Sequence, residues 1–532
     1  MAYTGNVARL PIGIQGFSGS RNPTQLQAGH LEYVEGLSLD GGLIQKEGGA
    51  SKLNASALGS GAAVLSGISY SPLADTHRDA VFLSDGSILK DSGLGTFPVT
   101  LASGLNSATQ PPPWFLMGGG ETVGAPRTLF CFSATNQVRA VDGDGAVMAA
   151  ITTPPADWAG SGNFPTFGVI HEDRLWGGGN ATDPHRIYYS TLSDHQNFTG
   201  TGSGTLAVFP GEGERIVGAT SFKGLLVVFK YPRGIYMVTT SDPSPAGWRV
   251  DRLSGATGGL NQHTIIPIDN DTMYMSASGS IHLLSATDAF GDAETSTISL
   301  IADINEFVRN YINVGALRNA CGLWYSYKNQ AWIALPQSNE TENNIRLIVD
   351  LSATNSVGPR FLLSRRDTPI SMWMRPNTET STKPAHGDSD GFIWNMDTDA
   401  RSKDGVGYPV AFQSANMDLS FIDPSLATLN KTGDFLELIF EPQGDWDLTV
   451  QVSWDDVPGP PLLYTMGGSG APLGAFILDT DELASTAIKS IRKRIAGSGR
   501  RIRIMANNEV VDQNIAISDF YLSFRTMDER SR

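Results

Sequence analysis

GLLVVFKYPRGIYMVTT, residues 224–240, carries the pattern that decides the fold class. Two runs rich in Val, Ile, Phe and Tyr flank the turn Pro232-Arg233-Gly234, which predicts two antiparallel strands joined by a tight turn. The same plan recurs at residues 81–90, 128–145, 271–286, 323–337 and 390–414. A recurrence of about 40–60 residues is the spacing of four-stranded propeller blades, so we predict a degenerate β-propeller without WD or kelch signatures.

The chain is too long for one ordinary core. It has 532 residues, 40% of them apolar, and its 59 glycines and 29 prolines are typical of an all-β protein with many tight turns. We expect an extended N-terminal arm and hairpin over residues 1–60, a propeller-like domain over 61–409 and a C-terminal β-sandwich over 410–532. Within the propeller, the apolar face of residues 302–313 predicts one helix.

The alternation that predicts the sandwich is clearest in WDLTVQVSW, residues 446–454. Every second side chain is apolar, so one face of this strand is buried and the other is polar. The apolar positions are Trp446, Leu448, Val450, Val452 and Trp454. Residues 488–495 fit both a helix and a strand pattern, and we interpret them as a strand.

The charge balance and the cysteine content exclude several protein classes. The formal net charge is −16 (38 basic and 54 acidic residues), a balance that does not favour binding to nucleic acid or to anionic membranes. Cys131 and Cys321 cannot form a disulfide framework, and we expect two buried free thiols. No secretory signal and no apolar run of ~18 residues is present, so we expect no membrane insertion.

The motifs that carry chemistry are weak in this sequence. VDGDGA (141–146) and GDSDGF (387–392) contain spaced aspartates, but neither supplies the ligand set of a calcium loop, so both are interpreted as turns. The sequence contains no nucleophile elbow and no Cys-rich metal motif. We therefore predict no catalytic residue, no cofactor and no metal site, and a protein that is not an enzyme.

One basic cluster stands out in this acidic chain. We interpret it as a candidate subunit interface that faces an acidic neighbour, with contact to DNA or lipopolysaccharide as the alternatives. The cluster consists of Lys489, Arg492, Lys493, Arg494, Arg500, Arg501 and Arg503.

DRLWGGGNATDPHRIYYSTLSDHQNF, residues 173–198, resembles a segment of the tail nozzle, hub and packaged-DNA-stabilisation proteins of short-tailed bacteriophages. The residues that fit the segment are Asp173, Arg174, Leu175, Trp176, Pro184, Arg186, Ile187, Tyr188, Ser190, Asp194 and Phe198. We interpret Trp176 and Tyr188 as core aromatics of a blade, and His171, His185 and His195 as turn or surface residues. Residues 17–49 resemble the opening arm of the family, and residues 383–414 resemble the segment that leaves its last blade.

The resemblance implies a structural virion protein of the tail that assembles in the bacterial host cytoplasm. Such a protein forms a homo-oligomeric ring, a hexamer, which lines the DNA exit channel and retains packaged DNA until ejection. It docks on a tail adaptor ring of the portal complex and supports tail fibres or spikes, while double-stranded DNA passes without specific binding.

Two other functions stay open at this stage. One is a carbohydrate-binding or depolymerising receptor protein of the tail, and the other is a neck or tail-tip component of a long-tailed phage. The exposure of the ten Trp residues distinguishes the receptor from the structural protein. A row of exposed Trp over a groove favours sugar binding, whereas Trp in the blade cores favours a structural role.

Overall fold

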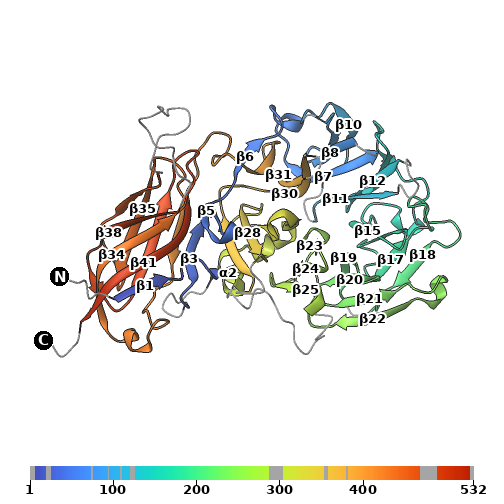
Figure 1. Cartoon of the computed structure of the whole chain (residues 1–532). Coiled ribbons are helices and arrows are strands. Elements are labelled where there is room, and N and C mark those ends of the chain that lie inside the picture. The colour runs from blue at the N-terminus through green and yellow to red at the C-terminus, as the bar shows by residue number, and fades with distance from the viewer. Residues whose placement is uncertain are drawn as a thin grey trace.

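Strands dominate the computed structural model, which describes residues 6–19, 26–73, 76–93, 95–107, 111–119, 126–211, 213–286, 304–352, 358–378, 381–467 and 488–527. They form a β-propeller and, beside it, a sandwich of two packed sheets (Figure 1). The prediction of an all-β protein with a propeller is confirmed. No helix in the described ranges is long and apolar enough to span a membrane.

Among the described residues, the propeller ring consists of seven sheets: six blades of four strands and one sheet of three strands. Four blades use consecutive strands: β7 (Val64–Leu73) to β10 (Val99–Ala102), β11 (Trp114–Gly119) to β14 (Ala149–Ala150), β15 (Phe167–His171) to β18 (Gly204–Ala207) and β19 (Arg215–Phe222) to β22 (Arg249–Ser254). A three-stranded sheet follows, β23 (Ile265–Ile268) to β25 (Ile281–Leu283). The fifth blade runs from β26 (Cys321–Tyr325) to β29 (Arg360–Ser364), and the sixth contains β30 (Ser371–Thr378), β31 (Ser381–Gly387) and β32 (Ile393–Thr398).

The first strands of successive sheets contact one another around the whole ring. The series runs from β7 through β11, β15, β19, β23 and β26 to β30, which contacts β7 again. Each blade is therefore covered by a neighbour on both faces. This explains the continuous apolar run of residues 224–240, in which Val227 faces one inter-blade core and Val228 faces the next. The hairpin itself is as predicted, with β20 (Leu225–Tyr231) antiparallel to β21 (Ile235–Thr239).

One predicted hairpin is wrong. Residues 390–414 contain two strands, but they do not pair with each other: β32 belongs to the sixth blade, whereas β33 (Val410–Ser414) belongs to the sandwich. The free edge of β32 is instead taken by β6 (Gly49–Lys52), which lies more than 300 residues earlier in the chain. A strand from the N-terminal arm thus completes the last blade and closes the propeller.

The two sheets of the sandwich pack face to face. One sheet has the order β38 (Lys489–Arg494), β34 (Asn430–Phe440), β41 (Ala516–Met527), β5 (Ile44–Lys46) and β4 (Leu37–Ser38), with β1 (Asn6–Leu10) also paired to β41. The facing sheet contributes β35 (Asp447–Trp454), β40 (Ile502–Asn508) and β33. The alternation predicted for residues 446–454 is present, since Leu448, Val450, Val452 and Trp454 are buried. The strand expected at 488–495 is β38.

The N-terminal arm links the propeller and the sandwich through one continuous sheet. Strands β2 (Gly16–Phe17) and β3 (His30–Glu35) stand between blade strand β29 and sandwich strand β33, so hydrogen bonding continues from β26 across to β35. The close approach of β2 to β29 requires glycine at position 16. A Cβ atom there would lie 2.8 Å from the carbonyl oxygen of Phe361, and the φ of Gly16 is +74°.

The predicted helix is present as α2 (Ile304–Tyr311). It buries Ile304, Phe307 and Val308, the apolar face expected from the sequence. Phe307 makes an edge-to-face contact with Phe17 of the arm at a centroid distance of 5.5 Å. The helix therefore packs against the arm where it passes the propeller. Cys131 and Cys321 are free and buried, as expected.

We predict that Gly16→Ala lowers the free energy of unfolding by roughly 1–2 kcal/mol for the left-handed backbone and by a further ~1–3 kcal/mol for the clash with Phe361. Gly104→Ala is the matched control, because Gly104 has a similar φ of +69° but open space around its Cβ position. Thermal or denaturant unfolding of both variants measures the difference. Equal destabilisation would show that the junction between β2 and β29 is not tightly packed.

Candidate functional site

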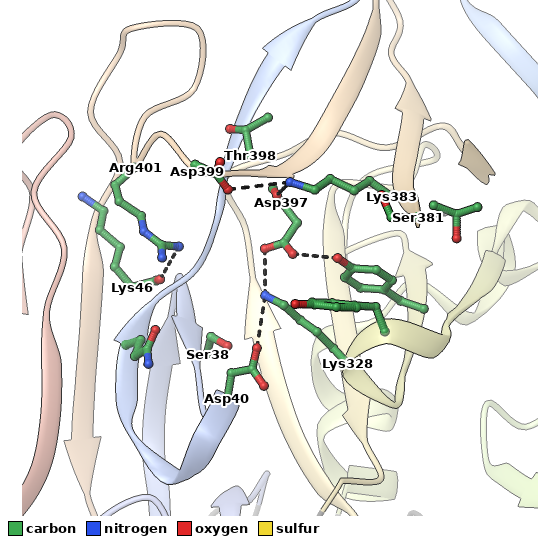
Figure 2. Close-up of a pocket in the computed structure, with 14 residues that line it drawn as sticks. Ser38, Asp40, Lys46, Lys328, Ser381, Lys383, Asp397, Thr398, Asp399 and Arg401 are labelled. Carbon is green, nitrogen blue, oxygen red and sulfur yellow. Dashed lines mark hydrogen bonds and ion pairs between the residues drawn. The ribbon is translucent and has the colours of Figure 1, made fainter. Parts of the chain in front are cut away.

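A polar cavity of about 330 Å³ lies where the arm meets the propeller (Figure 2). Three separate parts of the chain line it: the arm hairpin around Ser38 and Asp40, the turn between β26 and β27 (Gln330–Leu335) that contains Lys328, and the end of the sixth blade at residues 397–399. None of these parts forms a cavity alone. Ring closure by β6 brings them together.

Asp397 is the centre of the hydrogen-bond network in this cavity. Its carboxylate accepts hydrogen bonds from the Tyr325 hydroxyl at 2.9 Å and from Lys328 Nζ at 2.8 Å. Lys328 also lies 3.5 Å from a carboxylate oxygen of Asp40, so its ammonium group stands between two carboxylates (Figure 2). Lys383 Nζ donates to the main-chain carbonyl oxygen of Asp397 at 2.8 Å.

Burial and charge act in opposite directions on Asp397. Burial favours the neutral acid, but the charge of Lys328 and the hydrogen bonds from Lys328 and Tyr325 outweigh it and hold the pKa of Asp397 below its usual value. The backbone of Asp397 has a φ of +53°. Gly48 permits this arrangement, because a Cβ at position 48 would lie 2.8 Å from the Asp397 Cα. The carboxylate is thus ionised and held in one orientation.

A second cavity of about 270 Å³ adjoins the first over the sixth blade. The two cavities share Lys383, Thr398 and Asp399, and the second extends to Arg375 and Asn395. Arg375 is fixed by Asp79 at 2.5 Å. Asp399 is fully exposed and lies 3.8 Å from Lys383. We call the two cavities together the junction groove.

A buried network of charges lies beneath the junction groove. Glu47 of the arm forms an ion pair with Arg346 and lies 3.7 Å from Arg366, while Asp367 contacts Arg346 at 3.2 Å and Arg366 at 3.0 Å. All four side chains are almost fully buried. Burial opposes the charge on Asp367, but the neighbouring Arg366 and Arg346 outweigh it and hold its pKa far below the usual value.

Lys46 lines the larger cavity, while its ammonium group lies at the edge of this network. Its ammonium group donates to the Val510 carbonyl oxygen at 2.9 Å and lies over the ring of Tyr408. Burial, followed by the charge of Arg366, lowers the pKa of Lys46 to about 8. Its carbonyl oxygen, by contrast, accepts a hydrogen bond from Arg401 at the groove (Figure 2).

The basic cluster is divided between the two sheets of the sandwich. Lys489, Arg492, Lys493 and Arg494 lie on β38, at the edge of one sheet. Arg503 lies on β40 in the other sheet, and Arg500 and Arg501 directly precede that strand. The second group is surrounded by acids of its own chain. Arg503 pairs with Asp456 at 2.9 Å and with Glu32 at 3.3 Å, and the Asp455 carboxylate accepts from the backbone of Arg500 and Arg501. The role of the cluster as a subunit interface stays a prediction.

The residues of the phage-like motif are packing and turn residues of the third blade. Leu175, Trp176 and Tyr188 are buried in the blade cores, and Phe198 packs on Trp158. The other members make local polar contacts. Arg174 donates to the carbonyl oxygens of Ser190 and Gly202, Ser190 accepts from the Leu175 amide, and the Pro184 carbonyl accepts from the Ile216 amide. Between side chains, Arg186 pairs with Asp157 and Asp173 accepts from Ser193.

The interpretation of the histidines as turn or surface residues is wrong for His171, which is buried at the end of β15. His195 is also buried, but it does lie in a turn. The His171 ring reaches the next blade, with Nδ1 2.9 Å from Ser221 Oγ and Nε2 2.9 Å from Thr240 Oγ1. Because the blades stack, a side chain beside a turn is covered by its neighbour. A sequence pattern confined to one blade does not carry this information.

The aspartates of the two calcium-like stretches are held by protein groups. Asp144 contacts Arg78 at 2.8 Å and Lys90 at 2.7 Å, and Asp388 accepts from the amides of Asp390 and Phe392 and from the Trp394 indole. Among the described residues, no group of three or more His, Cys, Asp and Glu is arranged to hold a metal ion.

No protein-family model and no curated protein matches this sequence. Solved structures that are similar include an exo-β-1,3-galactanase from Phanerochaete chrysosporium with β-1,3-galactotriose, at 9% identity and a TM-score of 0.27, covering 90% of this chain and 100% of that chain. U3-55K is 8% identical with a TM-score of 0.39 over 65% of this chain and 98% of that chain. Chaetomium thermophilum Raptor is 11% identical with a TM-score of 0.40 over 66% of this chain and 29% of that chain.

The prediction that this chain is not an enzyme is contradicted by one of these likenesses. The exo-β-1,3-galactanase, to which the chain is similar over most of its length, is an enzyme. At TM-scores below 0.5, neither the substrate nor the partners of these proteins transfer to this chain.

The junction groove was not anticipated from the sequence. Its residues come from distant segments, where they lie in strands or in the turns between them. The part of the sequence that bears on the groove is Lys46-Glu47-Gly48 in the arm. Glu47 is the residue that enters the buried charge network, and Gly48 is the residue that allows Asp397 to approach.

We predict that the protein loses stability as the pH falls from 6.5 to 4, and that His386→Phe reduces this loss. His386 is buried beneath the groove, and burial, only partly offset by the charge of Asp367, lowers its pKa to about 4. Above pH 6.5 the ring is neutral in both states, whereas between pH 6.5 and 4 only the unfolded chain takes up the proton, which costs about 3 kcal/mol by pH 4.

Melting temperatures across this pH range measure the effect. His77→Phe is the matched control for replacing a histidine by phenylalanine, because His77 is exposed. Identical slopes for the wild-type protein and His386→Phe would contradict the assignment of a neutral buried ring.

Proposed function

We propose that this chain is a structural protein of a bacteriophage tail, the ring-forming nozzle or hub around the channel through which double-stranded DNA leaves the capsid. The ring is a homo-hexamer that docks on the adaptor ring of the portal complex and supports tail fibres or spikes. The protein assembles in the bacterial host cytoplasm and resides in the virion tail, where it retains DNA until ejection.

The observation that carries this proposal is that the N-terminal arm contributes strands to both the propeller and the sandwich. Strand β6 closes the propeller, β2 and β3 bridge the propeller and the sandwich, and β1 pairs with β41. Separating the bodies requires the rupture of backbone hydrogen bonds in several sheets at once. Such an arrangement suits a protein that bears the pressure of packaged DNA. Residues 173–198, which resemble the phage tail proteins, occupy core and turn positions of the same propeller.

The Trp residues favour the structural role over a receptor with a sugar-binding groove lined by Trp. All ten are buried or half-buried, and six of them lie deep in the cores. An exposed row of Trp, which such a receptor would need, is not among the described residues. The net charge of −16 supports a channel through which DNA moves without adhesion.

Ring formation is the first test. We predict that native mass spectrometry of the purified full chain detects a hexamer and that negative-stain images show rings with a central opening. Immunogold labelling of phage particles with antibodies against the chain is expected to mark the end of the tail. A chain that stays monomeric at high concentration and labels no tail would contradict the proposal.

We also predict that the chain binds duplex DNA only weakly at physiological salt. Phosphate contacts by Lys and Arg give salt-dependent binding through counterion release, and each contact would slow the passage of DNA. Fluorescence anisotropy with labelled duplex DNA at low and physiological salt measures the affinity, with the triple variant Arg500→Ala, Arg501→Ala, Arg503→Ala as comparison. Sub-micromolar binding at physiological salt that this variant abolishes would refute a non-adhesive channel and make the cluster a DNA contact.

A further inference from the structure

We infer that the junction groove is a binding site for a saccharide, an activity beyond the proposed structural role. The inference rests on three properties of the groove: a balanced set of charged donors and acceptors, an exposed aromatic ring at its wall, and an internal network that holds the polar groups in place without a ligand.

The charges of the larger cavity nearly cancel. Its three carboxylates belong to Asp40, Asp397 and Asp399, and its cationic residues are Lys46, Lys328, Lys383 and Arg401. The ammonium group of Lys46 donates to the Val510 carbonyl oxygen and lies over the Tyr408 ring. Ser38, Ser381, Thr382 and Thr398 add hydroxyl groups that both donate and accept. A sugar hydroxyl also donates and accepts at once, so it can bond to a carboxylate and to an ammonium group in the same site.

This arrangement disfavours the other ligands that a charged cavity could take. A phosphate or another compact anion would face three carboxylates, and like charges at close range oppose binding. A metal ion would meet lysine ammonium groups placed between the carboxylates, with Lys328 standing between Asp40 and Asp397 (Figure 2). A ligand rich in hydroxyl groups with no concentrated charge fits the groove better than either.

The aromatic wall is provided by Tyr327. Its side chain is 78% exposed, an unusual state for a large aromatic residue in a folded protein, and it lines the cavity beside the buried Tyr325. The two rings lie 6.2 Å apart at an angle of 31°. An exposed tyrosine ring offers an apolar face on which the C–H face of a sugar ring can pack, while its hydroxyl group stays available for hydrogen bonds.

The groove is preformed, and its two cavities share lining residues. The Asp397 carboxylate is fixed by Tyr325 and Lys328, and Arg375 is fixed by Asp79, so few side chains have to be ordered on binding. The two cavities, of about 330 and 270 Å³, meet at Lys383, Thr398 and Asp399. Their size is that of small-molecule sites, and their continuity suits an oligosaccharide.

The test is a glycan array probed with the labelled full-length protein, followed by titration calorimetry with the best oligosaccharide. We expect binding that falls at least tenfold in Tyr327→Ala and in Asp399→Ala. Both side chains are exposed, so these variants should melt at the wild-type temperature. Neutral and acidic glycans on the same array show which class of saccharide the groove accepts.

Tyr311→Ala is the matched control, because Tyr311 is also an exposed tyrosine but lies on α2 and lines neither cavity. It should bind like the wild-type protein. The inference is overturned if no glycan on the array binds, or if both groove variants keep the wild-type affinity. Ring formation by the groove variants is unaffected in either case, so this result and the test of the structural role are separate.

Discussion

The burial of the Glu47 carboxylate is the constraint on which the rest of this structure depends. A buried charge without partners is costly, so the arm can take only the position in which Arg346 and Arg366 meet Glu47. Those arginines come from the fifth blade and the segment after it, whereas Glu47 lies between a sandwich strand and the strand that closes the propeller. One set of ion pairs therefore fixes both the register of β6 in the last blade and the position of β5 in the sandwich.

The same constraint accounts for the composition of the junction. An apolar contact of equal area would hold the arm, but it would allow the arm to slide, since apolar packing has little directionality. Charged hydrogen bonds are directional, and Asp367 fixes the two arginines from the other side. The same ion pairs also affect the groove. Gly48 directly follows Glu47, so fixing Glu47 fixes the position of Gly48 and thus how closely Asp397 can approach the arm.

The sequence predicted what lies within one blade and missed what lies between distant segments. Hairpins such as residues 224–240 and the alternation of residues 446–454 follow from local periodicity, and α2 follows from its apolar face. The partner of β32 could not be predicted, because the pairing with β6 spans most of the chain and residues 410–414 offered a nearer apolar strand. The burial of His171 and the assembly of the groove were missed for the same reason: each depends on which blade comes next in space.

The pairing of β1 with β41 has a consequence for the synthesis of the protein. A ribosome delivers the chain from its N-terminus, so β6 has to wait for β32, and β1 has to wait until the residues of β41 emerge. The early strands keep unpaired edges during that time, and long-range pairing of this kind makes folding slow. A chain that stops before residue 516 lacks the strand that both β1 and β34 require. A truncated product of this kind therefore cannot complete the sandwich.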